Sequence, residues 1–285
     1  NKSFSVIISQ KIHSYKKNIK VDSDKSISIR SFLIGSISHD ISRVENILES
    51  DDVFSTINCL RKLGVKILKK ESGKYLIYGK GLGSLYIKRN SLLDFGNSGT
   101  LARLLIGILS TTPNINVKIK GDKSLNKRNM SKVIGLMSEF GAQFYPKNKF
   151  NLPLKLTSSE MPIGIKYESG VSAQLKSAVI LAGSNSYGTT TIIEKRESRN
   201  HTENILLKNS FKTIKIKKNR KKESLIKIHG KNYLNPLKMY IPGDPSSAAF
   251  FVALTLLNKK SLLKIKNVCL NPRRIGFYKL LKKNG

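Results

Sequence analysis

The chain has 285 residues and a formal net charge of +34, with 52 lysines and arginines against 18 aspartates and glutamates. Hydrophobic residues make up 39% of it, too many for a disordered basic tail, and no apolar run approaches the roughly 20 residues of a membrane-spanning helix. The length allows two domains, each with its own core.

The high charge by itself does not indicate a nucleic-acid-binding protein. The lysines are spread along the whole chain, and the densest basic run, 215–224, lies between two expected strands and is typical of a solvated turn. The apolar segment of the opening NKSFSVIIS is too short for a signal peptide. The sequence also lacks an initiator methionine, so we expect a processed chain or a fragment. Cys59 and Cys269 form no disulfide framework, and we expect both to be reduced core residues of a cytosolic protein.

Four segments in chain order share one design, in which a polar or small-residue start is followed by a mostly apolar helix. They are DKSISIRSFLIGSIS (24–38), NSGTLARLLIGILST (97–111), SAQLKSAVILAGS (172–184) and PSSAAFFVALTLLN (245–258). Aligning Arg30, Arg103, Lys176 and Phe250 spaces these helices 73, 73 and 74 residues apart. This regular spacing predicts an internal structural repeat.

A second kind of helix recurs between the first ones, as an amphipathic segment that ends at a glycine, the residue that favours a left-handed helix cap. These segments are 53–64, 130–141 and 273–285, while 202–211 fills the remaining place with Asn-Ser instead of glycine. Apolar runs at 65–68, 75–79 and 115–121 predict strands between the helices. The pattern predicts α/β units of the form βαβαββ, of which the chain holds just under four, and we expect it to be truncated inside the fourth.

Cations stand where helix dipoles do not favour them. Lys25 lies in the first turn of the first helix, and Arg30, Arg103 and Lys176 follow one turn inside otherwise apolar helices. A buried cation without a partner is costly, and the chain is poor in acids. Capping alone explains the small polar residues at these helix starts, whereas an anionic ligand also explains the cations.

Two further segments carry candidate anion-binding residues. GDKSLNKRNM places Arg128 just before a helix, and ESRNHTENI places Arg199 ahead of His201, Thr202 and Glu203, where Thr202 is a candidate cap and its neighbours are ordinary residues of a helix start. GKGLGS (79–84) lacks the lysine and helix of a phosphate-binding loop and predicts a turn. We find no metal-binding cluster, nucleophile elbow or paired catalytic carboxylates.

The chain resembles the 5-enolpyruvylshikimate-3-phosphate synthase family. DKSISIR, GNSGTLARLL, GDKSLNKRNM, SAQLKSAVILAG, SRNHTE and PGDPSSAAFF occur in that family's order and spacing, and the resemblance covers about residues 20–285. It implies a two-lobed enolpyruvyl transferase fold of six βαβαββ units. One lobe of three units would span 21–240, and 1–20 together with 241–285 would belong to an incomplete second lobe.

The resemblance also implies a function. The family transfers the enolpyruvyl group of phosphoenolpyruvate to the 5-hydroxyl of shikimate 3-phosphate and releases phosphate, without a metal or cofactor, as a cytoplasmic enzyme of aromatic amino acid biosynthesis and the target of glyphosate. We therefore expect a monomer with these two small-molecule substrates and neither nucleic acid nor membrane as partner, the fragment alone being inactive.

The resemblance assigns candidate residues to each substrate. It also makes Lys25 a candidate for proton transfer, and we expect Arg103 to support the residues that touch the substrates without touching them itself. For shikimate 3-phosphate they are Lys25, Ser26, Arg30, Ser172, Ala173, Gln174, Ser198 and Arg199. For phosphoenolpyruvate they are Lys25, Asn97, Gly99, Thr100, Arg128 and Gln174. The chain departs from the family at Asn129, usually proline, and at Asn200, usually aspartate.

Two alternatives remain open. UDP-N-acetylglucosamine enolpyruvyl transferase has the same fold and a related reaction, but it carries a reactive cysteine on a loop. Here Cys59 is expected within an amphipathic helix and Cys269 in a strand, and SRNHTE favours the shikimate enzyme. The other alternative is a non-catalytic basic protein that binds nucleic acid.

Overall fold

The structure is a computed structural model that describes residues 13–218 and 223–284. The N-terminal stretch 1–12, where we expect no signal peptide, and part of the basic run 215–224, where we expect a solvated turn, lie outside the described residues. The chain divides into a larger unit, Lys25–Ile241, and a smaller unit formed by Asn1–Asp24 and Pro242–Gly285.

The larger unit contains three four-stranded sheets that share one topology. In each sheet the first two strands are parallel, and the third runs antiparallel to both the second and the fourth. In spatial order the strands are β13 (Lys238–Tyr240), β2 (Ile41–Glu45), β4 (Lys74–Tyr78) and β3 (Ile67–Glu71); β5 (Leu92–Asp94), β6 (Asn116–Lys120), β8 (Leu154–Thr157) and β7 (Gln143–Tyr145); and β9 (Lys166–Ser169), β10 (Thr189–Glu194), β12 (Ser224–His229) and β11 (Ile214–Lys218).

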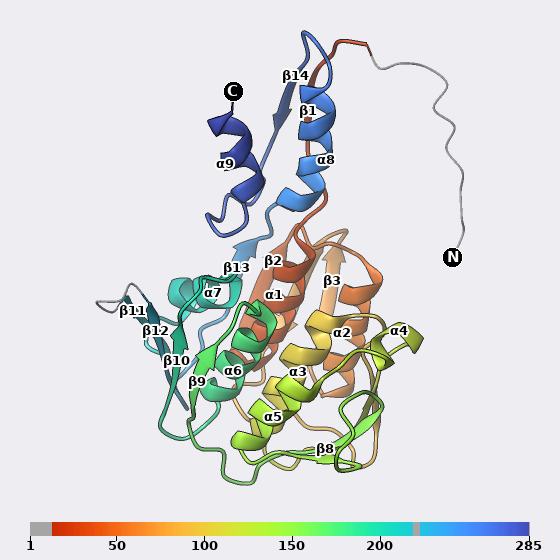
Figure 1. The fold of residues 1–285 in the computed structure, drawn as a ribbon. Helices are drawn as coiled ribbons and strands as arrows, with labels where there is room; N and C mark the ends of the chain where they lie inside the picture. Colours follow the sequence, from red (N-terminus) through yellow and green to blue (C-terminus); the bar gives the residue numbers. More distant parts are fainter. Residues whose placement is uncertain (1–12, 219–222, 285) are drawn as a thin grey trace. The chain divides into compact units, whose positions relative to one another are not determined.

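Three of the four helices predicted to begin with small polar residues form the interior of the larger unit. They are α1 (Lys25–Ile37), α3 (Gly99–Thr111) and α6 (Ala173–Ser184), which lie close to their predicted bounds. Nearly all of their residues are buried, so they are apolar around most of their circumference rather than along one stripe. Helix α3 packs against both α1 and α6 (Figure 1).

The second kind of helix is amphipathic, as its sequence predicts. It comprises α2 (Asp51–Lys62), α5 (Ser131–Glu139) and α7 (His201–Asn209). Gly64 and Gly141, which follow α2 and α5, have φ of 83° and 93°, the left-handed conformation expected of helix-capping glycines. A short helix, α4 (Lys123–Asn126), was not predicted; Asp122 caps it by accepting from the Leu125 N–H at 2.7 Å.

The smaller unit, within its described residues, pairs β1 (Lys16–Ile19) with β14 (Leu262–Ile265) in parallel and adds α8 (Pro245–Leu256) and α9 (Gly276–Lys283). The Arg274 guanidinium is buried and holds two carboxylates, Asp24 at 2.9 Å and Asp244 at 2.6 Å. Cys269 is free, but the prediction that it lies in a strand was wrong. This half-buried residue lies outside any strand, next to the isolated bridge of Val268 with Gly243. Among the described residues, no helix is long and apolar enough to span a membrane.

Helices α3 and α6 are in close backbone contact at Gly107. A Cβ at this position would lie 2.6 Å from the Ala178 carbonyl oxygen and 3.0 Å from its Cα, and backbone atoms in a packed helix cannot move aside cheaply. The absence of a side chain at Gly107 therefore sets how near the two helices lie.

We expect Gly107→Ala to lower the free energy of unfolding by about 1–3 kcal/mol, the usual cost of overpacking a core. Gly135→Ala is the matched control, because Gly135 is exposed within α5 and a Cβ there meets nothing within 4 Å. That substitution should raise the free energy of unfolding by about 0.5–1 kcal/mol through helix propensity. Urea unfolding of the 285-residue chain and both variants measures the difference, and equal stability of the two variants would contradict the packing.

Candidate functional site

The N-termini of α1, α3 and α6 lie at one end of the helix cluster. The Gln174 side-chain amide donates to the Thr100 hydroxyl at 3.0 Å, which joins the first turns of α6 and α3. Ser98 and Ser172 cap the same two helices by accepting from backbone N–H groups at 3.2 and 3.4 Å. Because the first N–H groups of a helix have no partner within it, their convergence makes this end favourable for anions.

Arg30 on α1 is buried, and its guanidinium is held from several sides. Its Nε donates to the Thr202 hydroxyl at 2.9 Å and its Nη2 to the Ser177 hydroxyl at 3.0 Å. Its Nη1 donates to the Ser26 carbonyl oxygen at 3.0 Å, and Thr202 in turn donates to Ser177 at 2.8 Å. These neutral groups fix the orientation of Arg30 without adding negative charge. The prediction of Thr202 as a cap was wrong, since Thr202 lies within the first turn of α7.

The sequence argument that each cation on these helices needs an anionic ligand is wrong for Lys176. Its ammonium lies 2.5 Å from Glu194 and 2.6 Å from Glu203, and all three side chains are at most 1% exposed. Burial on its own would raise the pKa of Glu194, but hydrogen bonds from Lys176 and Ser198 outweigh it, so this pKa lies below its ordinary value. Two glutamates of the chain itself therefore satisfy Lys176.

Two arginines meet at the start of α3. Arg103 donates to the Gly99 carbonyl oxygen at 3.1 Å, and Arg128 donates to the Asn97 side chain at 2.9 Å. Burial, and after it the charge of Arg128, lowers the pKa of Arg103 below its ordinary value. A Cβ at Gly99 would lie 2.8 Å from Arg103 Nη1 and 2.9 Å from Arg128 Nη1. Two like charges beside a helix N-terminus favour an anion at this place.

Lys25 is half-exposed, and its ammonium lies 3.0 Å from the Asp52 carboxylate. Asp52 stands in the first turn of α2, where an acid suits the helix dipole. Sequence reasoning missed Asp52, although an acidic residue at a helix start was available as a signal. Any ligand of Lys25 has to share the ammonium with this carboxylate.

Ser198 and Arg199 belong to the loop between β10 and α7. Ser198 is buried, and both its N–H and its hydroxyl donate to Glu194 Oε1, at 3.0 and 2.9 Å. Arg199 is exposed. Hydrogen bonds thus connect Ser198 to the Lys176 cluster. The hydrogen bond from Gln174 to Thr100 connects the groups around Arg30 to those around Gly99.

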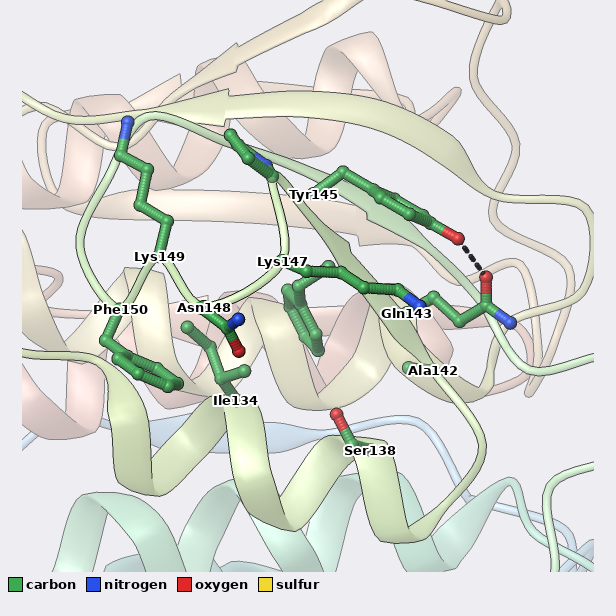
Figure 2. Close-up of a pocket in the computed structure, with 11 residues that line it drawn as sticks. Ile134, Ser138, Ala142, Gln143, Tyr145, Lys147, Asn148, Lys149 and Phe150 are labelled. Carbon is green, nitrogen blue, oxygen red and sulfur yellow. Dashed lines mark hydrogen bonds between the residues drawn. The ribbon is translucent and has the colours of Figure 1, made fainter.

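The cavity drawn in Figure 2 lies away from these residues. It has a volume of about 320 Å³ between α5 and the loop that joins β7 to β8, and there the Tyr145 hydroxyl donates to Gln143 at 2.6 Å. None of its lining residues is a candidate. A second hollow of about 420 Å³, between α5 and the start of α6, includes Ser172. Across residues 13–218 and 223–284, no cluster of metal-ligating side chains occurs.

The fold and these groups define an α/β protein in which cations gather near converging helix N-termini. The model of the EPSP synthase (3-phosphoshikimate 1-carboxyvinyltransferase) family matches residues 9–285, and the chain belongs to this family.

Named relatives show the same relationship. The chain is 40% identical over 266 residues to 3-phosphoshikimate 1-carboxyvinyltransferase of Paramagnetospirillum magneticum, covering 93% of this chain and 59% of the relative. It is 39% identical over 278 residues to the Bacillus subtilis protein of that name, covering 96% and 62%. The structure of EPSP synthase from Acinetobacter baumannii superposes with a TM-score of 0.84 at 32% identity, over 95% of this chain and 59% of that one. The chain thus spans about three fifths of its relatives' length.

The surroundings of Cys59 argue against the alternative enolpyruvyl transferase, which carries a reactive cysteine on a loop. The thiol is buried in α2 and donates to the Asp94 carbonyl oxygen at 3.3 Å. Burial raises the pKa of Cys59 to about 12. Since the thiolate is the nucleophile, a thiol with this pKa is inert at neutral pH.

We expect Cys59 to resist iodoacetamide at pH 8 in the native chain and to react once urea unfolds it. With a pKa of about 12, roughly one thiol in ten thousand is ionised at pH 8, against about a quarter at the ordinary value near 8.5. Cys269, half-buried, is an internal comparison and should react faster than Cys59. Peptide mass spectrometry measures both rates, and native labelling of Cys59 at the unfolded rate would contradict its burial.

Proposed function

We propose that this chain carries the shikimate 3-phosphate site, and part of the phosphoenolpyruvate site, of a 3-phosphoshikimate 1-carboxyvinyltransferase. The observation that carries the proposal is the convergence of three helix N-termini with Lys25, Arg30, Arg103 and Arg128 in a chain of this family. Both substrates are multiply anionic, and helix N-termini with arginines suit phosphate and carboxylate groups. Because the chain spans about three fifths of its relatives, the complete reaction belongs to a protein of the family's length.

In this proposal Ser26, Arg30, Ser172, Ala173, Gln174, Ser198 and Arg199 bind shikimate 3-phosphate, and Asn97, Gly99, Thr100, Arg128 and Gln174 bind phosphoenolpyruvate. Gln174 has the position that such a bridging role requires, because it starts on α6 and donates to Thr100 on α3. Gly99 lets an anion approach the backbone between two guanidinium groups, since no Cβ occupies the space.

The reaction replaces phosphate on the enol carbon of phosphoenolpyruvate by the 5-oxygen of shikimate 3-phosphate. One C–O bond forms, another breaks, and the hydroxyl proton has to leave. We assign Lys25 to contacts with both substrates and to proton transfer, with Asp52 holding its ammonium at 3.0 Å. Positive charge around the departing phosphate stabilises the charge that develops there.

We further propose that the protein works as a cytoplasmic monomer, without nucleic acid, metal or organic cofactor. Family membership supports this reading.

We expect the 285-residue chain to bind shikimate 3-phosphate saturably, and Arg30→Ala to weaken this binding by about ten- to hundredfold. Charge-assisted hydrogen bonds to a guanidinium contribute about 1.5–3 kcal/mol. Arg43→Ala is the matched control, because Arg43 is an exposed arginine on β2 and its loss changes net charge equally. Isothermal titration calorimetry measures all three proteins. Absence of binding by the wild-type chain, or equal weakening in both variants, would contradict the proposal.

In a protein of the family's length, Gly99→Ala should raise the inhibition constant of glyphosate, which occupies the phosphoenolpyruvate site in this family, by roughly ten- to hundredfold. The added methyl enters ligand space and pushes against Arg103 and Arg128, with an expected cost of about 1–3 kcal/mol. The KM for phosphoenolpyruvate should rise less, because this ligand is shorter. Gly135→Ala, which adds a methyl to open space, should change neither constant. A wild-type enzyme that resists millimolar glyphosate would refute the argument from Gly99.

A further inference from the structure

The buried cluster of Lys176, Glu194 and Glu203 joins three elements of the larger unit. Lys176 comes from α6, Glu194 from the end of β10 and Glu203 from the first turn of α7. The ammonium lies 2.5 Å from Glu194 and 2.6 Å from Glu203, and none of the three side chains reaches solvent by more than 1%. Replacing a buried charge cluster by apolar residues of similar volume is often neutral or stabilising, so stability alone is a weak explanation for three buried charges here.

Glu194 does more in this cluster than balance Lys176. Its Oε1 accepts from the Lys176 ammonium, from the Ser198 N–H at 3.0 Å and from the Ser198 hydroxyl at 2.9 Å. In the loop 195–200, Lys195, Arg196, Glu197 and Arg199 are exposed and Asn200 is half-buried, so Ser198 is its one buried residue. Glu194 therefore anchors this loop at its centre, and Arg199 follows the anchor directly.

We propose that Glu194 is a positioning residue, which fixes Ser198 and thereby presents the loop 195–200 to the phosphate of shikimate 3-phosphate. This inference rests on the proposed function, in which Ser198 and Arg199 belong to that site. Lys176 keeps Glu194 ionised in a buried place, and an ionised carboxylate accepts both Ser198 donors more strongly than a neutral group does.

The direction in which Glu194→Gln changes the affinity for shikimate 3-phosphate distinguishes a positioning role of Glu194 from a purely electrostatic one. A negative charge near a phosphate site repels the ligand, so on charge alone the substitution Glu194→Gln should tighten binding. If Glu194 acts through Ser198, the same substitution weakens binding, because the neutral amide holds the loop less firmly. Glu203→Gln removes an equally buried charge from the same cluster but leaves the bonds between Glu194 and Ser198 in place.

The experiment compares three variants of the 285-residue chain with wild type: Glu194→Gln, Glu203→Gln and Glu71→Gln. Glu71 is an exposed glutamate on β3, paired with Lys74 at 2.9 Å and not with the loop 195–200, and serves as the surface control. Calorimetry measures the affinity for shikimate 3-phosphate. Hydrogen–deuterium exchange of the segment 195–200 without ligand measures the anchoring of the loop, and thermal melting checks the fold.

We expect Glu194→Gln to weaken shikimate 3-phosphate binding about tenfold and to speed exchange in 195–200, while the other two variants stay within threefold of wild type. Unchanged exchange, or equal weakening in Glu194→Gln and Glu203→Gln, would overturn the inference. If the wild-type chain binds no shikimate 3-phosphate, the proposed function fails, but the exchange measurement still decides whether Glu194 anchors the loop.

A second variant keeps the proposal testable if Glu194→Gln does not fold. Lys176→Met/Glu194→Gln/Glu203→Gln removes all three charges together and leaves none of them uncompensated. We expect it to melt near the wild-type temperature and still to bind shikimate 3-phosphate about tenfold more weakly. Wild-type affinity in this variant, or loss of folding in both variants, would assign the cluster to stability alone and overturn the inference.

Discussion

The larger unit depends on one electrostatic constraint, which is that three nearly fully buried helices bring their N-termini together while carrying cations. Arg30, Arg103 and Lys176 stand on α1, α3 and α6, whose other residues are mostly buried and apolar. Both the helix dipoles and the low local polarity oppose positive charge there. The hydrogen bonds and ion pairs of Arg30 and Lys176 offset part of this cost.

The three cations meet the constraint in different ways. Two glutamates compensate Lys176 outright, hydroxyl and carbonyl groups orient Arg30, and Arg103 shares its surroundings with a second guanidinium, Arg128. The first arrangement also recurs in the smaller unit, where Arg274 lies between Asp24 and Asp244. A buried cation between two carboxylates from distant segments is thus a structural device in this chain. At the start of α3 the cations are arranged differently, because Arg103 and Arg128 donate to a backbone carbonyl and to a side-chain amide oxygen.

Sequence patterns located the helices and the motifs because both are local properties. Helical spacing and capping glycines such as Gly64 and Gly141 depend on neighbouring residues, and each motif is a short continuous stretch of the chain. The partners of the cations are not local. Glu194 lies 18 residues from Lys176, and β13 completes the first sheet by pairing with β2 from the far end of the unit, where the Leu237 N–H binds Ser42 across 195 residues. No periodicity in one sequence encodes such pairings, so Lys176 was assigned to a ligand when two glutamates hold it.

Helix α7 contacts both the charge cluster and Arg30, a residue of the proposed substrate site. Glu203 and Thr202 are adjacent in its first turn, so the helix that brings a carboxylate to Lys176 also brings a hydroxyl to Arg30. At α3, in contrast, Arg103 and Arg128 repel each other, and an anion bound between them would relieve this repulsion and stabilise the folded state. Glu194 and Glu203 thus hold the scaffold in place, whereas our proposed function assigns the positive charge at the starts of α1 and α3 to anionic substrates.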